Sequence, residues 1–239
     1  MSNLSHTKEF FMLVVSKKGK VPALKSVKIC AGLFAGGIAE LFSKKMISKD
    51  ENGEFFSNDN FKESYIYLFP LYEVIKTANK PVNMQEIAHS YYNSCCGKKP
   101  AQLEASIRDK LISRNAKTEI KTGFLRSKTN LVPKPEKVQA IISKIRAQLL
   151  GAEPLATDTF YLVDLLLKST MAQKHFSNED VTRLKIRLEE LYASGAYLLE
   201  KQLIDCAFNT ANTFLENMSW GDDDEDDDFL SPLFLFWLM

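Results

Sequence analysis

The chain has 239 residues, of which 45% are hydrophobic and 11% aromatic, enough for a substantial buried core. This composition excludes wholesale disorder. No run reaches the roughly 18 apolar residues of a membrane-spanning helix, and residues 1–8 lack the pattern of a secretory signal peptide. We therefore expect a cytoplasmic protein with reduced cysteines: Cys30, Cys95, Cys96 and Cys206.

The formal net charge of +1 conceals an uneven distribution. Seven consecutive acidic residues occupy 222–228, so the rest of the chain carries 31 Lys and Arg against 23 Asp and Glu, that is, 30 less these seven. Such a basic body favours an anionic partner, for example lipid headgroups or nucleic acid. Solvated surface lysines without any ligand are the alternative interpretation.

The N-terminal part predicts a helix followed by a hairpin. Residues 10–16 form an apolar run too short to assign to helix or strand from periodicity. From 25 to 47 the apolar residues recur every three or four positions, which predicts a helix with one buried face. Three glycines in this helix predict close packing of another backbone: Gly32, Gly36 and Gly37. Residues 46–56 predict a tight hairpin turning at 50–53.

The middle of the chain predicts three helices and a second hairpin. Residues 65–77 have helical spacing despite Pro70, and Asn83 with Glu86 predicts a capping box at the start of the next helix. A helix over 102–114 buries one face, formed by Leu103, Ile107 and Leu111. Strands at 118–121 and 124–128 should then form the hairpin, with Gly123 in its turn.

Four more helices are predicted over 136–150, 157–167, 178–192 and 197–218, the first of them stopping at Gly151. The fold class is therefore mostly α: a single multi-helix domain over 1–218 with two small β-hairpins, one of them projecting. The tail, residues 219–239, is acidic and then apolar, and we expect it to be disordered.

Motifs for common enzyme chemistry are missing from the sequence. No P-loop, dinucleotide-binding glycine turn, zinc-protease helix or C-x-x-C pair occurs, and the three histidines lie far apart along the chain. No nucleophile, base and oxyanion set can be assigned. We therefore expect a protein that is not an enzyme and that holds no cofactor and no metal.

Basic residues concentrate around the predicted helix 102–114 and the hairpin that follows it: Lys98, Lys99, Arg108, Lys110, Arg114, Lys117, Lys121, Arg126 and Lys128. Converging cations of this kind can bind phosphate groups. In a winged-helix DNA-binding protein, this helix would enter the major groove and the hairpin would be the wing. Glu104 and Asp109 would then lie near the DNA, which disfavours nucleic acid. A membrane-surface protein would place the same cations against anionic headgroups.

Several segments together resemble the Golgi phosphoprotein 3-like family. They are "CAGLFAGGIAELFSKKMI" at 30–47, "LEASIRDKLISRNAKTEI" before the hairpin, "LVPKPEKVQAIISKIRAQLLG" at 131–151, and residues 159–191. Gly32, Leu33, Glu40 and Leu41 match the family's first motif, and the shared order spans roughly residues 8–215. The overall pattern is closest to bacterial members.

The resemblance implies a helical domain that binds phosphatidylinositol 4-phosphate on the cytosolic face of membranes. In eukaryotic members of the family this is the Golgi membrane. It also implies recruitment of the cytosolic tails of membrane proteins. Homo-oligomers would form through the hairpin tip, here Phe124, Leu125 and Arg126.

Only part of the family's lipid site is present. Arg108 matches one of its arginines, whereas Phe34 and Ala105 replace two others, and its tryptophan falls near Leu24 or Lys25. The predicted lipid-phosphate ligands are therefore Arg108 and four nearby cations that could substitute for the rest: Lys25, Lys28, Lys110 and Arg114. A lysine is a point donor rather than a planar fork, so these substitutes need not reproduce the family's selectivity. A protein-interaction scaffold without a lipid site is the third interpretation.

Overall fold

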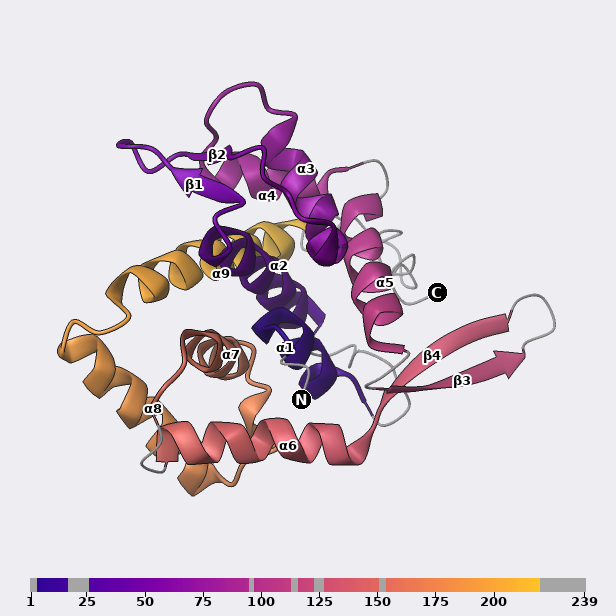
Figure 1. Cartoon of the computed structure of the whole chain (residues 1–239), viewed down its shortest axis with the longest axis vertical. Coiled ribbons are helices and arrows are strands. Elements are labelled where there is room, and N and C mark those ends of the chain that lie inside the picture. Colours follow the sequence, from indigo (N-terminus) through magenta and orange to yellow (C-terminus); the bar gives the residue numbers. More distant parts are fainter. Residues whose placement is uncertain are drawn as a thin grey trace, which may run out of the picture.

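A computed structural model describes residues 4–16, 26–94, 97–112, 116–122, 127–150 and 154–219 of the chain; for 26, 116–122, 127–130 and 219 it describes only the backbone. The described part is mostly helical with two antiparallel hairpins, as the sequence predicts (Figure 1). The predicted turn and stop glycines, Gly123 and Gly151, and the tail from residue 220 onward lie outside the described residues.

Two helices occupy the middle of the fold (Figure 1). The apolar run near the N-terminus is a helix, α1 (His6–Val14), and only Lys8 among its residues is not buried. Helix α2 (Ser26–Ser43) packs against α1, and the long C-terminal helix α9 (Leu198–Ser219) packs along α2. A helix that is apolar on nearly all sides is stable only inside a protein, so α1 is the centre of the core.

Glycines in α2 allow this close packing. A Cβ added at Gly32 would lie 2.5 Å from Cζ of Phe10, and one added at Gly37 would lie 2.3 Å from Cδ1 of Leu71. The prediction that another backbone approaches these glycines is wrong at both positions, because side chains fill the space. At Gly36 a Cβ would meet Thr7, including its Cα at 3.8 Å, so the backbones of α1 and α2 come close there.

The first hairpin has the predicted position, with strands β1 (Ile47–Lys49) and β2 (Phe55–Ser57). Its turn is closed by the carboxylate of Asp50, which accepts hydrogen bonds from the backbone N–H groups of Asn52 and Glu54. Gly53 has φ of +81°, a conformation that favours glycine.

The predicted helix 65–77 is divided into two elements. A 3-10 helix, η2 (Glu63–Leu68), precedes α3 (Phe69–Lys76), and Pro70 lies in the first turn of α3, where a missing N–H costs little. The capping box of α4 (Met84–Tyr92) is confirmed: the Asn83 side chain accepts from the Glu86 N–H, and Glu86 accepts from the Asn83 N–H, both at 2.9 Å.

Helix α5 (Lys98–Ile112) begins four residues earlier than predicted and buries Leu103, Ile107 and Leu111 as expected. The second hairpin consists of β3 (Ala116–Thr122) and β4 (Ser127–Pro133), paired from Ala116 with Pro133 to Thr122 with Ser127. The first strand is longer than the predicted 118–121, whereas the second begins three residues later than the predicted 124–128 and extends to Pro133. The hairpin projects from the helical body (Figure 1).

The remaining elements are α6 (Pro135–Ile145), the π-helical turn η4 (Arg146–Leu150), α7 (Thr157–Lys168), the 3-10 helix η5 (Ala172–Lys174) and α8 (Asn178–Ala193). They surround the lower part of α1 and α2 (Figure 1). The C-terminal end of α1 is held by η5, because Nζ of Lys174 donates to the carbonyls of Leu13, Val14 and Val15 at 2.5–3.2 Å. Three carbonyls that lack helical partners are thereby satisfied.

Asp164 on α7 makes stability depend on pH. Burial raises the pKa of this carboxyl to about 6, although Lys168 opposes the shift. Since the unfolded pKa is about 3.9, the folded chain holds the proton more tightly, and stability falls as pH rises from about 4 to about 6. Asp164→Asn should raise the free energy of unfolding by about 2 kcal/mol at pH 7.5 and by much less at pH 4.

Urea unfolding at the two pH values measures this difference. Lys168 keeps an ion-pair partner in the variant, because it also contacts Asp205. An equal effect of Asp164→Asn at pH 4 and pH 7.5 would show that ionisation of Asp164 is not responsible.

Candidate functional site

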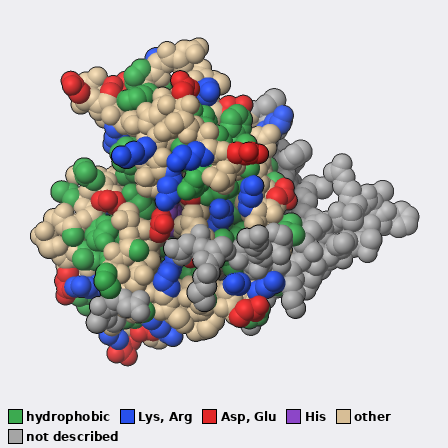
Figure 2. Space-filling model, in the orientation of Figure 1, with side chains coloured by type: hydrophobic (Ala, Val, Ile, Leu, Met, Phe, Trp, Pro, Cys, Tyr) green, Lys and Arg blue, Asp and Glu red, His purple; other side chains and the backbone are tan. Residues whose placement is uncertain are grey.

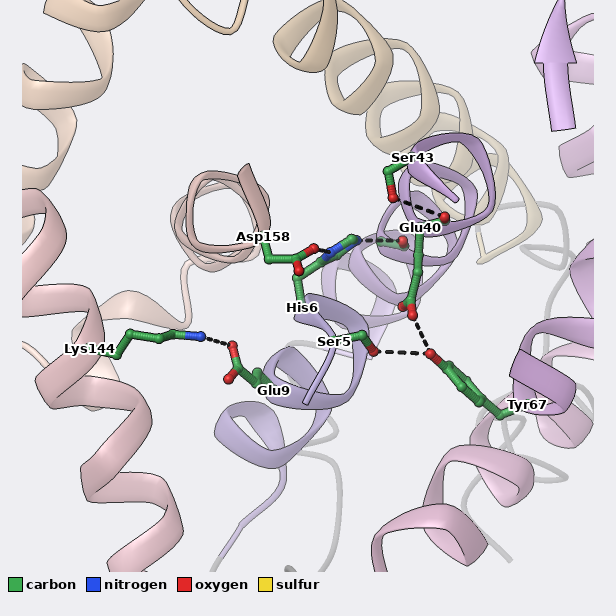
Figure 3. A network of polar contacts seen from close by, with 9 residues as sticks. Ser5, His6, Glu9, Glu40, Ser43, Tyr67, Lys144 and Asp158 are labelled. Carbon is green, nitrogen blue, oxygen red and sulfur yellow. Dashed lines mark hydrogen bonds and ion pairs between the residues drawn. The ribbon is translucent and has the colours of Figure 1, made fainter. Parts of the chain in front are cut away.

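Polar side chains from five segments gather around the N-terminal half of the buried helix α1 (Figure 3). We call this set the α1 polar cluster; its members are Ser5, His6, Lys8, Glu9, Glu40, Tyr67, Lys144 and Asp158. They come from α1 and the residue before it, and from α2, η2, α6 and α7. Burying so many polar groups is costly unless each is paired, so their contacts define what the cluster can do.

His6 is fully buried and is held at both ring nitrogens. Nδ1 lies 2.8 Å from Oδ1 of Asp158, and Nε2 lies 3.0 Å from the carbonyl oxygen of Gly36. Both neighbours accept hydrogen bonds, so a ring with protons on both nitrogens satisfies both contacts. The hydrogen bond from His6 lowers the pKa of Asp158, and burial partly opposes this. His6 therefore ties α1 to α2 and α7.

A second chain of contacts runs from Ser5 through Tyr67 to Glu40 (Figure 3). The Tyr67 hydroxyl donates to Oε1 of Glu40, and the Ser5 hydroxyl lies 3.0 Å from the Tyr67 oxygen. Glu40 is fully buried, and among the described residues its Oε2 has no hydrogen-bond partner. Burial, together with the Glu40 charge, raises the pKa of the Tyr67 hydroxyl, so the tyrosine stays a proton donor.

Four lysines from four segments lie in or beside this cluster, and we call them the lysine group: Lys8, Lys44, Lys110 and Lys144. The ammonium of Lys8 lies 4.0 Å from the centre of the Tyr67 ring. Burial lowers the pKa of Lys8, Glu40 opposes this, and the like charge of Lys110 lowers it further. Lys44 and Lys144 act on Asp158, and Lys144 also pairs with Glu9. Lysine and arginine side chains recur across the middle of this face (Figure 2).

The structure gives the predicted ligand residues different environments. Arg108 is half-buried and pairs through Nε and Nη2 with Oε1 of Glu104, while its guanidinium lies 5.3 Å from the centre of the Phe11 ring. This pairing neutralises much of the charge that a lipid phosphate would need. Lys28 on α2 and Lys110 on α5 are exposed. The remaining predicted site residues lie outside the described side chains: Lys25, Arg114, Phe124, Leu125 and Arg126.

The contacts of the α1 polar cluster join helices and leave neither ring nitrogen of His6 without a partner. His6 could act as a base only by giving up the contact with Asp158 or with Gly36. The other two histidines do not join it, because His175 contacts Leu13 at the opposite end of α1 and His89 packs on Phe214. Among the described residues no group of three or more His, Cys, Asp or Glu could hold a metal ion. The described helices include none long and apolar enough to span a membrane.

Sequence reasoning missed most members of the cluster. In the sequence, His6 is one of three widely separated histidines, and Tyr67 and Asp158 are residues of predicted helices without any distinguishing motif. Glu40 carried a usable signal, because a lone carboxylate among the apolar residues of α2 must be paired or functional when buried. The hydrogen-bond partner of the Glu40 carboxylate, Tyr67, lies 27 residues away along the chain, and no local pattern indicates it.

No protein-family model and no curated protein matches the chain. The similarity to the Golgi phosphoprotein 3-like family is therefore carried by the quoted sequence segments alone.

Proposed function

We propose that the chain is a non-enzymatic peripheral membrane protein that binds anionic lipid headgroups at the lysine group. By its resemblance to the Golgi phosphoprotein 3-like family, the preferred headgroup is phosphatidylinositol 4-phosphate. The protein would then act on the cytosolic face of a membrane.

One observation carries the proposal: Lys110 on α5 is close enough to Lys8 on α1 for its charge to lower the pKa of Lys8. Placing like charges together costs free energy, and an anion that binds between them recovers it. Outside residues 222–228 the chain also has an excess of basic residues. Each lysine near an anionic surface contributes about 1 kcal/mol to binding.

The contacts of these side chains favour a ligand set that differs from the predicted one by including Lys8. Arg108 is engaged with Glu104, so it would have to exchange partners before binding a phosphate. Lys110 is exposed, and Lys8 is only partly covered by the Tyr67 ring. We therefore assign the main headgroup contacts to Lys8 and Lys110, with Arg108 as a support for α5.

The double variant Lys8→Gln/Lys110→Gln should reduce binding to vesicles by about tenfold or more, because two lysine contacts contribute about 2 kcal/mol. Liposome flotation measures this, with phosphatidylinositol 4-phosphate and phosphatidylserine vesicles at matched surface charge. Preference for the phosphoinositide supports a specific headgroup site, and equal binding supports general attraction to anionic surfaces.

The matched control is Arg183→Gln/Lys185→Gln, which removes two exposed cations from α8. It should bind vesicles like the unaltered chain, and a melting temperature for each variant checks that the fold is intact. Vesicle binding that falls equally in both double variants would contradict a site at Lys8 and Lys110. Salt-sensitive binding of duplex DNA without vesicle binding would favour the winged-helix alternative.

Self-association is a further part of the proposal. The β3–β4 hairpin extends away from the helical body, where it could reach a second copy (Figure 1). By the resemblance, the contact residues would be Phe124, Leu125 and Arg126 at the tip. A role as an adaptor for cytosolic tails of membrane proteins rests on the resemblance alone.

A further inference from the structure

Two large apolar side chains are exposed at the junction of η2 and α3. Ile66 is 44% exposed and Phe69 is 39% exposed. They are three residues apart, so in consecutive helical turns they lie on neighbouring parts of one surface. We call this pair the apolar tip. A single exposed apolar residue needs no explanation, but a pair beside a cluster of cations can mark a binding surface.

The apolar tip rests on an aromatic base. The Phe61 ring meets Phe69 edge to face at 5.6 Å between centroids, and it stacks on Tyr72 at 4.5 Å. Tyr72 is buried, whereas Phe61 and Tyr65 are partly buried beside it. These contacts support the partly exposed Phe69 ring on a rigid base. Little side-chain conformational entropy is therefore lost when the ring moves from water into an apolar medium.

Lysines border the apolar tip. Tyr67, next to Ile66, carries the ammonium of Lys8 over its ring, and Tyr72 carries that of Lys76 at 5.9 Å. Lys62 is exposed just before η2. Two acidic groups are also near in sequence: Glu63, which is exposed, and Asp59, which pairs with Lys76 at 3.5 Å. The charges of Glu40 and Lys110 also act on Lys8, so the four lysines Lys8, Lys62, Lys76 and Lys110 stand against three acids.

We propose that Ile66 and Phe69 insert into the interfacial layer of an anionic bilayer while the neighbouring lysines contact its headgroups. Aromatic and aliphatic tips flanked by lysines suit this layer, because the stems of the lysines lie against apolar surface and their charges reach the headgroups. The proposal rests on the proposed function. It adds a second, salt-insensitive contribution to binding, from segments that sequence reasoning did not connect with the lipid.

A protein partner fits these observations less well. Two side chains offer far less apolar area than the roughly 1,000 Å² that a specific protein interface buries. A bilayer needs no shape complementarity and accepts a small apolar tip, provided that charge attraction holds the protein at the surface.

The first test compares partition onto vesicles of 30% phosphatidylserine in phosphatidylcholine. The variant Ile66→Ser/Phe69→Ser should bind about tenfold more weakly than the unaltered chain, since each apolar side chain loses its burial. The loss should persist at high salt, where the contribution of Lys8 and Lys110 is screened. Ile186→Ser/Leu199→Ser is the control, because it removes two exposed apolar residues from α8 and α9 and should leave partition unchanged.

The second test detects insertion directly. The chain has only two tryptophans, so Phe69→Trp in a Trp220→Phe/Trp237→Phe background places a single fluorophore in the apolar tip. Vesicles with brominated acyl chains should quench this tryptophan and shift its emission to the blue. Ile186→Trp in the same background should show neither effect.

The outcomes separate the two proposals. Vesicle binding that Lys8→Gln/Lys110→Gln weakens, but that Ile66→Ser/Phe69→Ser leaves unchanged, with no quenching at position 69, would overturn insertion and keep the headgroup site. Quenching together with the tenfold loss supports insertion. No binding of the unaltered chain to anionic vesicles would overturn both proposals.

Discussion

Replacing His6 with phenylalanine should lower the free energy of unfolding by about 3 kcal/mol. The ring of phenylalanine has nearly the same size, but it cannot donate to the carbonyl of Gly36 or to Asp158. The carbonyl contact is buried, so losing its donor costs desolvation without compensation. Asp158 is 39% exposed and can recover part of its loss through water, which keeps the estimate below the upper range for buried ion pairs.

The pH dependence of the His6 variant provides an independent check. In the unaltered chain the pKa of Asp158 is lowered, so this group contributes stability above its unfolded pKa of about 3.9, and that contribution is lost as pH falls through the folded value. In His6→Phe the difference between the variant and the unaltered chain should therefore shrink as the pH falls from the unfolded value of about 3.9 through the lowered folded value. Urea unfolding at pH 7 and in acid measures both quantities.

His89→Phe is the matched control for this experiment. His89 is exposed on α4 and contacts Phe214 edge to face, so its replacement should change stability by less than about 0.5 kcal/mol. Equal effects of His6→Phe and His89→Phe would refute the assignment of His6 as the link between α1, α2 and α7.

The second large effect is expected at Gly32. Gly32→Val should destabilise the fold by about 3 kcal/mol, because a Cβ at this position would lie 2.5 Å from Cζ of Phe10. The Phe10 ring is fully buried and rigid, so relief requires α1 to move away from α2. That movement would also strain the contacts of His6 and Lys8 on the same helix. Thermal unfolding detects the change as a lower melting temperature.

Lys28→Val is the control, since Lys28 is exposed on the same helix. Lys→Val loses a few tenths of a kcal/mol of helix propensity, whereas Gly→Val gains about as much. The amount by which Gly32→Val is less stable than Lys28→Val is therefore a lower limit for the clash with Phe10. If Gly32→Val melted at the same temperature as Lys28→Val, α1 and α2 would not be packed as described.

Local signals in the sequence were sufficient for most of the fold. The helical repeat in α2, α6, α7, α8 and α9 placed these helices to within a few residues, because one buried face of a helix is enough to mark it. The capping box at Asn83 and the turn at 50–53 were predicted correctly, since their hydrogen bonds join residues only a few positions apart. Pro70 divided one predicted helix because proline is accepted in a first turn but not in an interior one.

Tertiary structure alone decided the candidate site. The partners of His6 lie 30 and 152 residues away, and Lys144 reaches Glu9 across 135 residues, distances at which no periodicity or motif carries information. Arg108, which sequence reasoning placed at the centre of a lipid site, is engaged by Glu104 one helical turn away. Local patterns in the sequence of this protein determined where its helices form. The packing of those helices decides which charged side chains remain available to a ligand, because pairing and burial are properties of the folded state.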